Sequence, residues 1–199
     1  MDNLRDLLEH KYHYNCLQHN KPQNTNNMKL SNLFLIALFT ITTVTAFSQS
    51  FEVPKDYELK SPSDYTRYEK DIIDAAKWLK ETPLYEQEEK HQKVFAFVLQ
   101  WVNGSPNVNV EINPTIMDFE KKNKGMLILY MASSARYVLE NNYSKDMRAK
   151  HKFSLHEMIA VYKATRDIKR DKKMEKLIKS DEEGKLDEWL SENLKIGSN

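Results

Sequence analysis

Two stretches of this chain are apolar around most of a helical circumference, and they constrain its fold more than any other feature. Residues 86–103 and residues 126–140 each place large apolar side chains on several faces of the helix that their spacing predicts. A helix that is apolar on most sides must be covered on most sides. The sequence therefore predicts a core built around these two segments, with other helices packed against them.

The remaining segments are typical of amphipathic helices. Apolar residues recur at three-to-four spacing over 61–80, and Ser154 with Glu157 forms a capping box that predicts a helix start at residue 154. Residues 108–112 alternate between apolar and polar, which favours a short extended segment. We expect a mainly α fold, a single compact bundle of about six helices within residues 49–199.

The segment before this bundle has the order of a secretory signal peptide. Lys29 precedes an apolar run over residues 33–47, and Ala46 and Ser48 are small residues suited to cleavage after residue 48. The run is shorter than the roughly 20 apolar residues that span a membrane. We predict a signal peptide over residues 28–48, so the membrane is a partner only transiently, through this segment.

A polar stretch, residues 1–27, precedes the predicted signal peptide, although a signal peptide is expected at the start of a chain. We interpret residues 1–27 as an over-extended start or a disordered leader. The alternative is a tail before an uncleaved anchor. The only cysteine, Cys16, falls in this stretch. The exported domain would then contain neither a disulfide nor a thiolate metal site.

Charge and motifs exclude several kinds of chemistry. The formal net charge of +1 is too small for a protein whose main partner is a nucleic acid. Residues 156–160 begin like a zinc-protease helix, but Ala160 occupies the position of the second histidine. We expect His91 at the surface and His156 in the first turn of a helix. The sequence predicts no catalytic residue, no metal site and no cofactor.

A few residues are candidates for contact with a ligand or partner. Arg136 falls among apolar residues of the 126–140 segment, where an isolated charge would be costly to bury. It either reaches solvent or pairs with a carboxylate or a bound anion. The aromatic residues are numerous, and we expect one or two of them to be exposed at a contact surface. The candidates are Trp78, Tyr85 and Trp101.

The chain also resembles a group of small exported helical proteins of Bacteroidota-type bacteria. The resemblance is carried by residues 101–105, by the alternating residues 108–112, by Met126–Glu140 and by Met174–Lys179. Residues 47–49 are similar to leader ends in that group. Because the group has no assigned activity, the resemblance implies only export and a helical fold.

The function expected from the sequence is that of an exported, soluble, non-enzymatic binding or interaction protein of the cell envelope, periplasmic or secreted. Its partner would be a protein or a small ligand that the sequence does not identify. One alternative is an envelope hydrolase that uses the carboxylates of Glu111 and Asp118, which flank the least helical segment. Another is a membrane-anchored accessory protein, if the leader is not cleaved.

Overall fold

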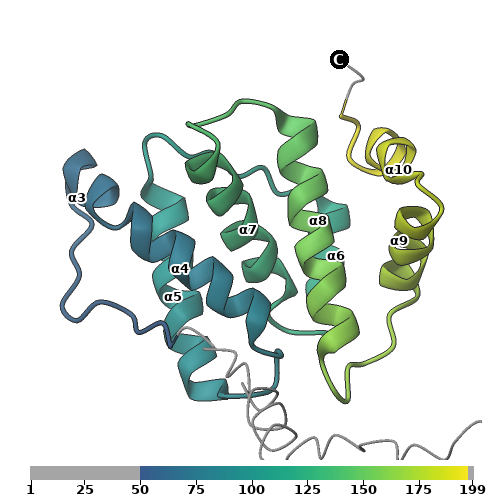
Figure 1. Ribbon diagram of the computed structural model, residues 1–199, viewed down its shortest axis with the longest axis horizontal. Coiled ribbons are helices and arrows are strands. Elements are labelled where there is room, and N and C mark those ends of the chain that lie inside the picture. Colours follow the sequence, from purple (N-terminus) through teal and green to yellow (C-terminus); the bar gives the residue numbers. More distant parts are fainter. Residues whose placement is uncertain (1–49, 197–199) are drawn as a thin grey trace, which may run out of the picture. The chain divides into compact units, whose positions relative to one another are not determined.

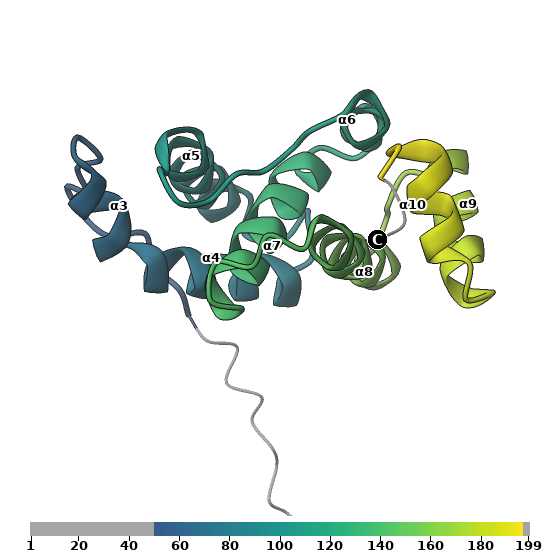
Figure 2. The ribbon, with the colours of Figure 1, turned by 90° about the horizontal axis from the view of Figure 1, so that it is seen from above.

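Helix α7 (Met126–Glu140), the second of the two apolar segments, lies among the other helices of the described residues (Figure 1). This computed structural model describes residues 50–196. Helix α7 packs against α4 (Glu69–Glu81), α5 (Glu88–Gly104), α6 (Pro114–Glu120) and α8 (Met147–Ala164). Figure 2 shows α4, α7 and α8 in a row, with α5 and α6 on one side of it.

Three shorter helices complete the described chain. Helix α3 (Pro62–Arg67) precedes α4. Helices α9 (Lys172–Glu182) and α10 (Leu186–Asn193) lie next to each other, and α10 contacts α8 (Figure 1). The apolar stripes of α9 and α10 are narrow, because only Met174, Leu177, Leu186 and Leu190 are buried in them.

The prediction of a mainly helical fold is confirmed, but the expected number of about six helices is not. The described residues contain eight helices. One reason is that the helix expected over residues 61–80 is divided. Tyr68, with φ −97° and ψ 9°, leaves the helical region between α3 and α4. The sequence pattern continues through this break, because the apolar spacing is nearly the same on both sides.

The predicted helix start at Ser154 is wrong. Helix α8 begins at Met147, where the side chain of Asp146 accepts a hydrogen bond from the backbone N–H of Ala149 at 2.9 Å. Ser154 lies in the middle of the helix and is buried. Its hydroxyl donates to the carbonyl of Lys150 at 2.9 Å, so the residue that resembles a cap satisfies its polar group inside the helix.

Residues 108–113 belong neither to a helix nor to a strand in the described chain, so the expected extended segment is not confirmed. This connection joins α5 to α6 and is held at both ends. Trp101 accepts the backbone N–H of Ser105 on its carbonyl at 2.9 Å, and the side chain of Asn113 caps α6 by accepting the N–H of Ile116 at 3.1 Å.

Gly125 is required where the chain enters α7. Its φ of 98° is in the left-handed region, and a Cβ atom at this position would lie 2.7 Å from the ring of Phe95. A side chain would therefore face both backbone strain and a steric overlap. The close packing of α5 against the start of α7 depends on this glycine.

The predicted leader (1–27) and signal peptide (28–48) lie outside the described residues. Within residues 50–196, no helix combines the length and the apolar character that crossing a bilayer requires.

Candidate binding cleft

A cleft of about 840 Å³ lies between two connections of the described chain. One wall is the α5–α6 connection, and the other is the α7–α8 connection. Most of the lining residues have polar side chains, which include hydroxyl, amide, carboxylate and ammonium groups. The lining residues are Thr66, Pro106, Asn107, Asn109, Glu111, Val138, Tyr143, Ser144, Lys145, Met147 and Lys150.

Lys150 forms part of the cleft and fixes one of its walls. The residue is 3% exposed. Its Nζ donates to Oε2 of Glu111 at 2.5 Å and to the carbonyl of Asn109 at 3.0 Å. Because an ammonium group without a partner is costly to bury, these bonds hold the α5–α6 connection against α8.

A buried polar network lies between α7 and α8. One of its members, His151, directly follows Lys150 in the sequence. The Tyr130 hydroxyl and Nδ1 of His151 share a hydrogen bond, and the hydroxyls of Ser134 and Ser154 share another at 2.8 Å. Burial, with a smaller contribution from the charge of Lys150, lowers the pKa of His151 to about 4. Burial also raises the pKa of Tyr130. Both side chains are therefore neutral at physiological pH.

The opposite wall of the cleft has an unusual backbone. Asn142 and Tyr143 have φ of 53° and 56°, in the left-handed region that bulky side chains rarely adopt. The backbone N–H of Tyr143 donates to the carbonyl of Val138 at 2.8 Å, and its hydroxyl donates to Glu69 at 2.8 Å. Left-handed residues are common where a helix ends, and these contacts fix the wall against α7 and α4.

The cleft carries one positive charge without an ionic partner in the described chain. Lys150 is neutralised by Glu111, whereas Lys145 is exposed and forms no ion pair with any residue in 50–196. The lining therefore has an excess of one positive charge. A carboxylate or another anionic group on a ligand would compensate this charge.

Arg136, the first sequence candidate, pairs with carboxylates and does not line this cleft. Its Nε donates to Glu140 at 2.9 Å, and its Nη1 donates to Glu157 at 3.4 Å. Lys80 binds the other oxygen of Glu157 at 2.7 Å, and the guanidinium lies 5.3 Å from the ring centre of Phe153. The sequence leaves open whether Arg136 reaches solvent or pairs with an anionic group. In the structure it pairs with the carboxylates of Glu140 and Glu157, within a network that joins α4, α7 and α8.

Two of the three aromatic candidates are buried, and the third is exposed. Trp78 is 2% exposed, and Trp101 is fully buried with its Nε1 donating to the carbonyl of Tyr65 at 2.9 Å. Both belong to the core, and we do not include them in the proposed site. Tyr85 is 44% exposed and borders a smaller, mainly apolar cavity of about 390 Å³ that Lys124 also lines.

The two carboxylates of the hydrolase alternative are each held by lysines. Glu111 accepts from Lys150, and Asp118 pairs with Lys121 at 2.5 Å and with Lys173. The hydrogen bonds from these lysines lower the pKa of Asp118 to about 2. An acid of that strength is ionised at physiological pH and is unsuited to donate a proton to a leaving group.

The histidines do not lie where the sequence analysis expects them. His91 is buried against the ring of Trp78, with a ring-centre distance of 4.7 Å, so its expected surface position is wrong. His156 lies inside α8 and its Nε2 contacts Asp181 of α9 at 2.8 Å. Among residues 50–196, no three or more His, Cys, Asp or Glu side chains are grouped so that they could hold a metal ion.

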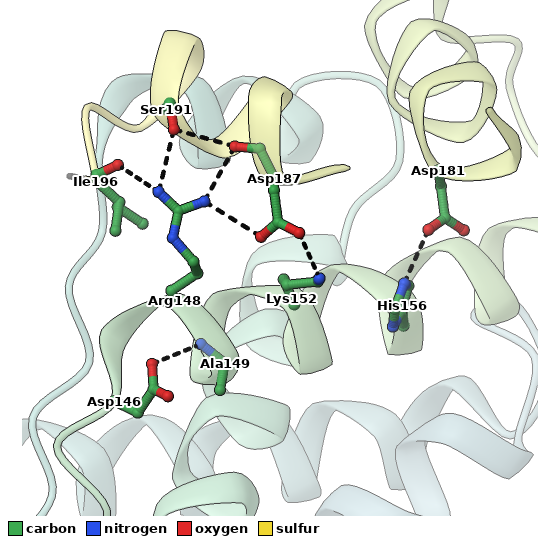
Figure 3. Close-up of polar contacts among 9 residues, drawn as sticks. All are labelled: Asp146, Arg148, Ala149, Lys152, His156, Asp181, Asp187, Ser191 and Ile196. Carbon is green, nitrogen blue, oxygen red and sulfur yellow. Dashed lines mark hydrogen bonds and ion pairs between the residues drawn. The ribbon is translucent and has the colours of Figure 1, made fainter. Parts of the chain in front are cut away.

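A second polar cluster joins α8 to the C-terminal helices (Figure 3). Arg148 donates from Nη1 to the carbonyl of Asp187 at 3.1 Å, and from Nη2 to the hydroxyl of Ser191 at 3.1 Å and the carbonyl of Ile196 at 2.9 Å. Lys152, one turn further along α8, binds the carboxylate of Asp187 at 2.8 Å. The contacts are internal to the fold, so this cluster positions α10.

The main cleft residues that sequence reasoning misses are Lys150 and its partner network. If the helix began at residue 154, as the sequence pattern predicts, Lys150 would lie outside it. With the start at residue 147, the spacing of Lys150, Ser154 and Val161 places them on one buried face. Asp146, a good cap residue before this segment, is the signal that could have identified the start.

A comparison of the chain with protein-family models, with curated proteins and with solved structures finds no match in any of the three.

Proposed function

We propose that this chain is an exported binding protein of the cell envelope, and that its ligand occupies the cleft between the α5–α6 and α7–α8 connections. The observation that carries the proposal is the cleft itself, at about 840 Å³ within the range of ligand sites. The polar side chains among its lining residues support the same role. The part of the proposal that concerns export rests on the leader over residues 28–48.

The polar groups of the cleft are suited to recognition rather than to bond cleavage. Glu111, the carboxylate that lines the cleft, is held by Lys150, and the neighbouring His151 is buried and neutral. The amides of Asn107 and Asn109 offer both donors and acceptors to a ligand. A binding role uses these groups as they stand, without a change in protonation.

The export part is tested by fractionation and by intact mass of the native protein. We expect the periplasm or the medium to contain a chain that begins at Gln49. A full-length chain that is recovered from the cytosol would contradict export. A chain that is extracted only with detergent and retains residues 28–48 would favour the anchored alternative.

The binding part is tested with two sets of defined probes, an array of short peptides and an array of oligosaccharides. We expect at least one probe class to bind, and Lys145→Glu to weaken that binding by roughly tenfold, about 1.4 kcal/mol. Lys124→Glu is the matched control, because Lys124 is also an exposed lysine but lines the smaller cavity. If Lys124→Glu lost binding and Lys145→Glu did not, the binding site would be assigned to the smaller cavity. No binding to either array would contradict the proposal.

A further inference from the structure

We propose that the ligand of the cleft is a short acidic saccharide, whose sugar ring lies against the ring of Tyr143 and whose anionic group is bound by Lys145. This inference rests on the proposed function, since it names the class of ligand for the same cleft. Three features of the exposed lining carry it: a fixed aromatic ring, an asparagine amide that is open to a ligand, and a lysine without an ionic partner in residues 50–196.

Tyr143 provides a flat apolar surface in the cleft. The residue is 43% exposed, and no other aromatic ring of the described chain packs against it. Its backbone N–H donates to the carbonyl of Val138 at 2.8 Å, and its hydroxyl donates to the carboxylate oxygens of Glu69 at 2.9 and 2.8 Å. The side chain is therefore fixed at both ends before a ligand binds. The negative face of such a ring attracts the C–H groups on the face of a sugar ring.

The apolar groups that the cleft exposes are flat rather than deep. Pro106, on the wall opposite Tyr143, is also an exposed ring. The aliphatic lining residues are less accessible, since Val138 is buried and Met147 is half-buried. A peptide is usually anchored by an apolar side chain in a well-packed pocket, and the exposed part of this lining has no aliphatic side chain to form one. Two exposed rings suit the face of a sugar ring better.

The open polar groups of the cleft match hydroxyl groups. Asn107 is exposed, and its amide forms no hydrogen bond with any residue in 50–196. Asn109 donates from Nδ2 to Oε1 of Glu111 at 2.9 Å, which leaves its amide oxygen as an acceptor. Val108, between the two asparagines, is 3% exposed, so this wall offers its side chains and not its backbone. Neighbouring sugar hydroxyls each donate and accept, and they can satisfy both groups of an amide.

Lys145 determines that the saccharide is acidic. Lys150, the other lysine of the lining, is paired with Glu111, whereas Lys145 is exposed and has no ionic partner among residues 50–196. A neutral saccharide would leave this charge uncompensated, and one carboxylate or one sulfate ester would compensate it. Because an exposed ion pair is screened by water, its contribution to affinity should be modest.

The first experiment tests the charge. It compares three forms of the tightest-binding oligosaccharide of the array: the uncharged parent, a form with a carboxylate and a form with a sulfate ester. We expect at least one charged form to bind the wild type roughly fivefold more tightly than the parent, and Lys145→Glu to remove this preference. Equal affinity of the three forms for the wild type would overturn the acidic saccharide, and so would a preference that persists in Lys145→Glu.

The second experiment locates the sugar ring by nuclear magnetic resonance. Protons that lie over the face of an aromatic ring shift upfield, so we expect this shift at C–H protons of the bound sugar. Tyr143→Phe, which keeps the ring, should retain the shift. Tyr143→Leu, which keeps an apolar side chain without the ring, should lose it and bind roughly tenfold more weakly.

The absence of an upfield shift with the wild type would overturn the position of the sugar ring, even if Tyr143→Leu did not fold. Wild-type affinity in a Tyr143→Leu variant with an unchanged circular dichroism spectrum would also overturn it.

A third experiment tests the amide of Asn107. Asn107→Ala should weaken the three forms of the oligosaccharide by a similar factor, roughly fivefold, because the amide binds hydroxyls and not the charge. Asn103→Ala is the matched control, since Asn103 is an exposed asparagine of α5 that does not line the cleft. Wild-type affinity in Asn107→Ala would overturn the contact.

The failure of this inference can be distinguished from the failure of the proposed function. If peptides of the array bind and oligosaccharides do not, with Lys145→Glu weakening that binding, the proposed function stands and the saccharide inference fails. If neither class binds, both fail.

Discussion

Lys150, Tyr130 and His151 bring polar atoms into a core that is otherwise largely apolar. Each has its polar group satisfied: Lys150 by Glu111 and Asn109, and the other two by each other. A buried network of this kind stabilises one arrangement of the helices, because any shift leaves a polar atom without a partner. It also connects the floor of the cleft to the interface between α7 and α8.

The neutral state of His151 predicts a loss of stability in acid. Its pKa in the folded chain is about 4, below the ordinary 6.5, because burial and Lys150 disfavour the charged ring. As the pH falls below 6.5 the unfolded chain binds a proton that the folded chain does not, until the folded ring is protonated near pH 4. This contribution lowers the free energy of unfolding by on the order of 3 kcal/mol across that window.

Chemical denaturation from pH 7 to pH 4 measures this effect. We expect His151→Gln to have a shallower decline in unfolding free energy than the wild type. His156→Gln is the control, since His156 is an exposed residue on the same helix and should leave the decline in place. Equal slopes for His151→Gln and the wild type would contradict the assignment.

The helices divide into a central set and a peripheral pair. Helix α7 contacts α4, α5, α6 and α8, whereas α9 and α10 each bury two apolar residues and also form polar contacts with α8 (Figures 1 and 3). Local opening is favoured where few apolar contacts hold an element. The pair α9–α10 is therefore the part of the described chain that should open most easily.

Arg148→Ala should loosen this pair without unfolding the centre. The arginine connects α8 to Asp187, Ser191 and Ile196, and the other side chain of α8 that reaches α10 in Figure 3, Lys152, contacts Asp187 alone. We expect acrylamide to quench Trp189 of α10 more strongly, while the buried Trp78 and Trp101 keep their wild-type quenching; single-tryptophan variants separate the three signals. Lys163→Ala, which removes an exposed pair with Glu182, should change the unfolding free energy by less than about 1 kcal/mol.

Helix α7 contacts α4, α5, α6 and α8, so a cavity in it should lower the stability of all the central helices together. Leu129 is 1% exposed and lies near the start of this helix. Leu129→Ala should lower the free energy of unfolding by about 2–5 kcal/mol. Because α7 contacts α4, α5, α6 and α8, the unfolding transitions measured by far-ultraviolet circular dichroism and by tryptophan fluorescence should shift together to a lower denaturant concentration.

Leu190→Ala is the matched comparison, since Leu190 is fully buried but lies in the peripheral α10. In Leu190→Ala, we expect the fluorescence of Trp189 to change at a lower denaturant concentration than the circular dichroism signal. If Leu129→Ala also separated the two signals, α7 would not be the element that makes unfolding cooperative.

The class of the fold was predictable because helical apolar spacing is a local property. Residues 86–103 and 126–140 require cover on most sides, and no tertiary information is needed to see it. Local patterns were less informative about boundaries. Ser154 resembles a cap and lies inside α8, while Asp146 forms the actual cap. Tyr68 interrupts a pattern whose apolar spacing continues across it.

The cleft depended on contacts between residues that are distant in the chain. Lys150 and Glu111 are 39 positions apart, and Tyr130 and His151 are 21 positions apart. Spacing along the chain carries no information about such pairs. The sequence therefore indicates Arg136 as a candidate contact residue and does not indicate Lys150. The sequence could specify which faces of the helices must be buried. The tertiary packing determined which polar groups are buried together, because only the approach of segments that are distant in the chain makes the ammonium of Lys150 and the carboxylate of Glu111 neighbours.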